Sequence, residues 1–222
     1  MDLLPLYLSA KLAAIATVIL IGLAAPLAWW LTNGAWPGKS FVEALFNLPI
    51  ALPPTVIGFY LLFVLGPRGS VGRAWETLFG GPLLFTFTGI VVASIFYSLP
   101  FAVQPIKASF ERIDPRLKES AYVLGLSPAA TFFRVIIPNS LSGIAAAAIL
   151  VFLHTMGAFG VVLMVGGSIA GETRVASIAI YEAVQAGNDG RANVLVLVSS
   201  LVCIAVLLLA ARLAGRSGGS RH

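Results

Sequence analysis

The chain has 222 residues, of which 59% are hydrophobic and only 10% are charged, and its net charge is +5. Soluble domains carry about 25% charged residues, so this composition excludes an ordinary water-soluble domain and indicates an integral membrane protein. The positive charges stand between apolar runs instead of forming a basic patch, which argues against a nucleic-acid partner. The single cysteine, Cys203, excludes an intrachain disulfide and a cysteine metal cluster, and we expect no metal site.

Five long stretches of the chain lack Asp, Glu, Lys and Arg altogether. A helix of about 20 apolar residues crosses the ~30 Å hydrocarbon core of a bilayer, and a charge at its centre is costly. We therefore predict an all-α, polytopic membrane protein with about five spanning helices, near residues 8–32, 41–65, 83–108, 134–158 and 192–214.

The segment 173–185 has a helical pattern, but it is too short to cross alone and it carries Arg174 and Glu182. We interpret it as a short outer interfacial or re-entrant helix, and a sixth span at this place is the alternative. Residues 1–215 are expected to form a single transmembrane domain, and 216–222 a disordered tail.

Lysine and arginine are more frequent in the segments that lie on the side of the membrane opposite the N-terminus than in those on the same side. Because cytoplasmic loops collect these residues, five spans place the N-terminus outside and the C-terminus in the cytoplasm. The sequence thus predicts a multi-pass protein of the cell (inner) membrane with lipid on most sides.

Prolines interrupt the second predicted span at Pro49, Pro53 and Pro54. Proline removes a backbone donor, and in lipid the carbonyls it frees need protein or water partners. This backbone should face the bundle or a cavity, which predicts a pathway lining at Pro53, Pro54, Thr55 and Gly58. A packing kink that touches no substrate is the alternative.

The loop 111–138 on the predicted cytoplasmic side has clear helix boundaries. Asp114 suits an N-cap with Pro115 at the first helical position, and Gly125 suits the left-handed residue that ends a helix. Ser127 and Pro128 begin a second helix in the same way. The predicted helix, about 115–124, places Leu117, Ala121 and Leu124 on one stripe, which fits either a lipid surface or a groove in a partner protein.

A resemblance decides between these uses. Glu119-Ser120-Ala121, three residues, Gly125, nine residues and then Val135-Ile136-Ile137-Pro138 is similar to the EAA loop of binding-protein-dependent ABC importer permeases, with mild departures at Ser120, Val135 and Ile137. Within that family, the segments 48–58, 66–69, 171–174 and 180–181 resemble molybdate permease subunits. Ala158 and Ala170 depart from the Glu and Pro usual there.

This resemblance implies the pathway subunit of an ATP-driven importer for a tetrahedral oxyanion, molybdate foremost, with sulfate or tungstate as alternatives. Its partners would be a second copy of the chain, two cytoplasmic ABC ATPase subunits and an external solute-binding protein. The residues implied in ATPase coupling are Glu119, Ser120, Ala121, Leu124, Gly125 and Leu126. Those implied at the pathway or gate, beyond the proline segment, are Gly157, Phe159 and Gly160. Arg174 is added from its own chemistry, because a guanidinium suits the oxygens of a tetrahedral anion at the outer mouth.

Two catalytic motifs nearly fit the sequence. Segment 34–40 ends in Gly38-Lys39-Ser40, but a phosphate loop needs four residues between its glycines and this chain has three. We therefore expect no cofactor on this chain, and ATP with magnesium in the partner subunit.

Ser168 with His154 would make an intramembrane serine hydrolase, the alternative from another class, although His154 is better suited to a hydrogen bond within the bundle. For Arg174, the alternative to a role at the gate is an ion pair with Glu172.

Overall fold

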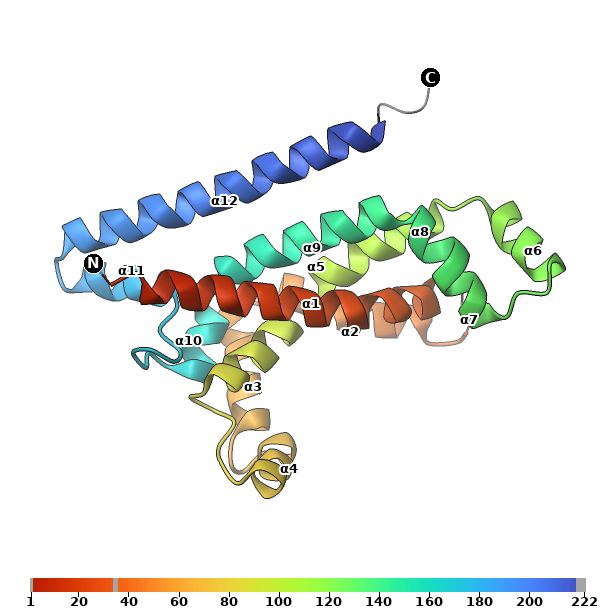
Figure 1. Ribbon diagram of the computed structural model, residues 1–222. Helices are drawn as coiled ribbons and strands as arrows, with labels where there is room; N and C mark the ends of the chain where they lie inside the picture. The colour runs from red at the N-terminus through yellow and green to blue at the C-terminus, as the bar shows by residue number, and fades with distance from the viewer. Residues whose placement is uncertain (1, 34–35, 219–222) are drawn as a thin grey trace.

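The computed structural model describes residues 2–33 and 36–218, in which all regular structure is helical (Figure 1). Residues 34 and 35, in the segment that resembles a phosphate loop, lie outside this description, as do 219–222 of the expected tail. The last helix, α12 (Asp189–Gly218), continues three residues into the segment 216–222 that we expected to be disordered. The all-α fold class is confirmed.

The core of the molecule is a bundle of three long helices, α1 (Leu4–Asn33), α5 (Phe87–Glu111) and α9 (Leu141–Met156). Fully buried alanines stand where these helices meet, among them Ala28, Ala102 and Ala147. Without a hydrophobic driving force between helices in lipid, small residues of this kind let helix backbones approach closely. The bundle is therefore a packed scaffold for the segments that surround it.

Three helices, α1, α5 and α12, are each long and apolar enough to cross a membrane, and two bent helix pairs raise the number to as many as five. This agrees with the prediction of about five spans. The apolar stretch of α12 is only 6% buried and has a mean hydropathy of 3.0, so most of its surface is available to lipid or to another subunit.

The second predicted span, 41–65, is not one helix. It forms α2 (Lys39–Ala51) and α3 (Pro54–Leu65), and the chain bends by 113° between them. Leu52 and Pro53 adopt extended backbone angles between them, because proline offers no N–H to continue the helix and disfavours the helical conformation of the residue before it.

The fourth predicted span, 134–158, is also bent, by 74° near Ser140. Before the bend lie α7 (Pro128–Thr131), the π-helical turn η1 (Phe132–Ile136) and α8 (Ile137–Asn139), and after it lies α9. Pro138 lies in α8, where it can donate no backbone hydrogen bond.

Three short helices complete the fold. The helix α4 (Ser70–Phe79) was not predicted; α10 (Gly160–Gly166) follows the glycine break after α9; and α11 (Ala176–Gln185) is the short helix expected over 173–185. With ten residues, α11 is about 15 Å long and cannot span a bilayer, so the sixth-span alternative is not supported. Figure 1 shows α3 and α4 projecting to one side of the bundle.

A polar clamp joins α2 to α5. Lys107 Nζ lies 2.7 Å from Glu43 Oε1, and Gln104 Nε2 donates to Asn47 Oδ1 at 2.6 Å. Lys107 also approaches Glu111 at 3.6 Å, but Glu111 is 52% exposed, against 26% for Glu43.

We expect Glu43→Gln to lower the free energy of unfolding in detergent by about 1–2 kcal/mol, because it leaves a largely buried ammonium without its nearest carboxylate. Glu111→Gln removes a charge from the same lysine at an exposed position, and it should cost less than about 0.5 kcal/mol. Thermal or denaturant unfolding of the two variants compares them directly. Equal effects would contradict the clamp.

Candidate functional site

The helix α6 (Pro115–Val123) is formed by the caps that the sequence predicts. Asp114 accepts a hydrogen bond from the backbone of Arg116 at 2.9 Å, and Pro115 begins the helix. At the other end Gly125 has φ +78, and the amides of Gly125 and Leu126 donate to the carbonyls of Tyr122 and Ala121. These two bonds form a Schellman motif, which fixes the turn into α7.

The surface of α6 is largely uncovered. Glu119, Ser120 and Gly125 are exposed, and Leu126 is partly buried. Of the predicted apolar stripe, only Ala121 packs inside the molecule, at 4% exposure, whereas Leu117 is 44% and Leu124 79% exposed. Val123 adds a further apolar side chain at 87%. The helix therefore has an exposed apolar surface that can contact lipid or a partner protein.

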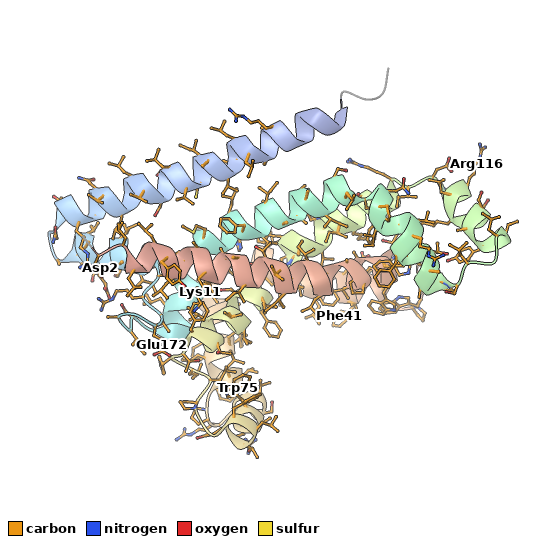
Figure 2. The ribbon with its side chains drawn as sticks, in the orientation of Figure 1. Asp2, Lys11, Phe41, Trp75, Arg116 and Glu172 are labelled. Carbon is orange, nitrogen blue, oxygen red and sulfur yellow. The ribbon has the colours of Figure 1, made fainter. Side chains whose placement is uncertain are left out.

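One lysine ties α6 to the end of α1. Lys118 Nζ lies 5.1 Å from the centre of the Trp29 ring and 3.4 Å from Asn33 Oδ1. Burial of this ammonium lowers the pKa of Lys118 from its usual value. Figures 1 and 2 show α6, with Arg116, at the end of the molecule opposite Asp2, while the C-terminal end of α12 lies toward α6. Through these contacts, a movement of α6 would displace the end of α1.

A second feature is a cavity of about 520 Å³ where α3, α5, α9 and α10 meet. Its lining combines residues from three separate segments of the chain. They are Pro54, Thr55, Tyr97, Leu153, His154, Gly157, Ala158, Phe159 and Gly160. None of these side chains carries a formal carboxylate, ammonium or guanidinium charge.

The structure brings together five of the eight predicted pathway residues. Pro54 and Thr55 from the proline segment line the same cavity as Gly157, Phe159 and Gly160, about 100 positions later in the chain. A Cβ built on Gly160 would lie 3.1 Å from Pro54 Cβ, so the two segments are in close contact. The predicted pathway segments therefore form one site.

The other three predicted pathway residues lie away from the cavity lining. Pro53 is the residue before α3 and is exposed. Gly58 is buried on α3 against α10, where a Cβ would lie 2.7 Å from Met164 Cβ.

Arg174 lies after α10, and its Nε is 3.0 Å from Ser168 Oγ and 3.1 Å from Glu182 Oε2. Its acidic partner is therefore Glu182 and not Glu172, the partner expected from the sequence.

The serine hydrolase alternative finds no support in this geometry. Ser168 accepts its hydrogen bond from Arg174, while His154 Nδ1 lies 3.0 Å from Ser98 Oγ. The expected hydrogen bond of His154 within the bundle is thus confirmed. Across residues 2–33 and 36–218, no three His, Cys, Asp or Glu side chains gather in a way that could hold a metal ion.

Four cavity residues were absent from the predicted pathway set: Tyr97, Leu153, His154 and Ala158. Leu153 resembles an ordinary bundle residue in the sequence, whereas Ala158 was noted only as a departure from the glutamate usual in related chains. His154 could have been included, because an ionisable residue within a charge-free run often has a functional role. Tyr97 lines the cavity because α5 packs against α9, a contact that the sequence does not specify.

A bundle of spanning helices, a capped surface helix at one end and a cavity at a proline-broken span together define a membrane transport component. The sequence matches the family described as binding-protein-dependent transport system inner membrane component over residues 19–218, and the chain belongs to this family. Because its relatives are permease subunits, it is a transport component of the inner membrane and not an enzyme.

Among curated proteins, the chain is 46% identical to the molybdenum transport system permease protein ModB of Azotobacter vinelandii, over 92% of each chain. It is 33% identical to the sulfate transport system permease protein CysT of Escherichia coli, over 82% of this chain and 65% of CysT. A solved bacterial ABC transporter involved in alginate import has the same fold, with a TM-score of 0.77 at 17% identity, covering 96% of this chain and 79% of that one.

Proposed function

We propose that this chain is the pathway subunit of an ATP-driven importer whose substrate is molybdate. The observation that supports this most strongly is α6: a firmly capped helix with exposed Val123 and Leu124, at one end of a spanning bundle. An apolar helix surface held rigidly in this way suits docking in a groove of a partner protein. Sulfate and tungstate remain the alternatives as substrates, and the higher identity to a molybdenum permease than to a sulfate permease favours molybdate.

The proposed assembly contains two copies of this chain, two cytoplasmic ATPase subunits and an external binding protein. Nucleotide and magnesium would bind in the ATPase subunits alone. A second copy is supported by α3, α4 and α12, whose large apolar side chains are exposed, including Phe63, Leu78 and Leu201. These surfaces suit either lipid or another transmembrane subunit.

We propose that the end of the bundle with α6 faces the cytoplasm. Arg112, Arg116, Lys118 and Arg134 all belong to α6 or to the segments that flank it, and such clusters mark cytoplasmic loops. With α6 inside, the N-terminus lies outside and the C-terminal end of α12 lies inside, since they stand at opposite ends of the molecule (Figure 1).

The function is tested by reconstituting the chain with its cognate ATPase and binding protein in lipid vesicles. We expect uptake of radiolabelled molybdate that requires both ATP and the binding protein, and that unlabelled tungstate and sulfate inhibit more weakly than unlabelled molybdate. Stronger inhibition by sulfate would reassign the substrate. ATP-independent uptake, or no uptake of any of the three oxyanions, would contradict the proposed function.

A further inference from the structure

Three polar groups in the cavity have no hydrogen-bond partner within the described part of the chain. They are His154 Nε2, the Thr55 hydroxyl and the Tyr97 hydroxyl, which come from α9, α3 and α5. The other lining side chains are apolar or glycine. Thr55 is exposed, and Tyr97 and His154 are partly buried, so all three groups are accessible to a ligand. Three hydrogen-bonding side chains around one otherwise apolar cavity suit a ligand with several acceptor atoms.

The imidazole of His154 is held in a fixed position. Its ring stacks on Phe101 with centroids 3.9 Å apart, and Tyr97 packs against it at 4.5 Å. Ser98 Oγ lies 3.0 Å from Nδ1 and 3.0 Å from Thr155 Oγ1, and both Ser98 and Thr155 are buried. The ring therefore keeps one edge against the bundle, while the residue lines the cavity.

The direction of the hydrogen bonds among Thr155, Ser98 and His154 sets which nitrogen of His154 carries hydrogen. When Thr155 donates to Ser98 and Ser98 donates to Nδ1, the neutral imidazole bears its hydrogen on Nε2. Nε2 is then a donor, in a cavity where the Thr55 and Tyr97 hydroxyls are donors as well.

We propose that His154, Thr55 and Tyr97 form a transit site for the tetrahedral oxyanion, which they bind through neutral N–H and O–H donors. The proposal rests on the proposed function, because it assumes that an oxyanion crosses this subunit. Conduction needs a site favourable enough to enter and weak enough to leave. Neutral donors meet both needs, whereas a lysine or arginine would bind the anion more strongly.

Transport variants test the role of each donor. His154→Leu and Thr55→Val each remove one donor, and we expect each to lower the molybdate carried per ATP hydrolysed in vesicles by about fivefold. His154→Gln retains an N–H in nearly the same place and should stay within about twofold of the wild type. Thr17→Val is the matched control, because the Thr17 hydroxyl bonds to Ala13 O within α1, away from the cavity.

A protection measurement does not depend on altering the fold. Diethyl pyrocarbonate modifies histidine, and this chain has only His154 and His222. In the assembled wild-type transporter, we expect molybdate to slow modification of His154 by about threefold or more relative to chloride of the same ionic strength, with His222 as the reference, since an oxyanion in the cavity keeps the reagent away from the ring.

The proposed function and the transit site fail in different ways. If the wild type takes up none of the oxyanions, the function is wrong and the site falls with it. If the wild type transports molybdate but His154 is not protected, the site is wrong and the function stands. Equal losses in His154→Gln and His154→Leu would likewise overturn it, because they would show that the ring is needed for packing alone.

Discussion

Replacing Leu124 by glutamate is expected to weaken ATPase docking about thirtyfold while leaving the permease folded. Leu124 is 79% exposed at the end of α6, next to Val123 at 87%, so the change removes no packing inside the chain. In a docked complex it would bury a carboxylate in an apolar groove, which costs about 2 kcal/mol or more and weakens association about thirtyfold. Co-purification with the ATPase subunit and binding-protein-stimulated ATP hydrolysis measure the effect.

Leu124→Met is the matched control for this change. It keeps the volume and apolar character of the side chain, so association should stay within about threefold of the wild type. Both variants should unfold at the wild-type temperature. If Leu124→Glu retained full association and stimulated ATP hydrolysis, α6 would not be the docking element.

The second large effect is expected at Gly58, where α3 meets α10. A Cβ at this position would lie 2.7 Å from Met164 Cβ and 3.4 Å from Val161 Cα, and neither atom is the free end of a flexible side chain. Gly58→Ala must therefore separate the two helices that begin at the cavity. Overpacking of this kind costs about 1–3 kcal/mol, and we expect oxyanion uptake to fall about tenfold.

Gly22 provides the control for Gly58. It lies on α1 with nothing within 4 Å of its Cβ position. Because alanine has a higher helix propensity than glycine, Gly22→Ala should stabilise α1 by up to about 1 kcal/mol. Unfolding in detergent and uptake in vesicles are measured for both variants. A Gly58→Ala protein as stable and active as Gly22→Ala would show that close approach of α3 and α10 is not required.

The geometry suggests how force at α6 reaches the cavity. From α6 the chain passes through α7, η1 and α8 into α9, and α9 ends at Met156 beside the cavity residues His154 and Gly157. The π-helical turn η1 interrupts the regular helical hydrogen bonding along this route, and such turns frequently stand at functional sites. A series of helices, connected by the turn after α6 and the bend near Ser140, therefore joins the exposed surface of α6 to the cavity wall.

Local signals in the sequence were sufficient for α6 and for the number of spans. Asp114, Pro115 and Gly125 act within one turn of the backbone, so their effect does not depend on the rest of the fold. Charge-free runs likewise mark spans by their length alone. These are the features that the structure reproduces most closely.

Features that depend on packing could not be predicted in the same way. The prolines showed that the second span is disrupted, but the 113° angle between α2 and α3 depends on where α3 packs against α10. The helix α4 was missed because it is short and carries Arg73 and Glu76, which hid it among loop residues. The meeting of Thr55 with Gly157 and His154 is a long-range contact, and nothing in either segment alone specifies it.

Accessibility of α6 tests the central claim most directly. With Cys203→Ser removing the single native thiol, Val123→Cys places a reporter at the most exposed apolar position of α6. We expect a membrane-impermeant maleimide to label it only from the cytoplasmic face of vesicles, and bound ATPase subunits to block the labelling. Labelling from the outer face, or undiminished labelling with the ATPase bound, would contradict a cytoplasmic docking helix.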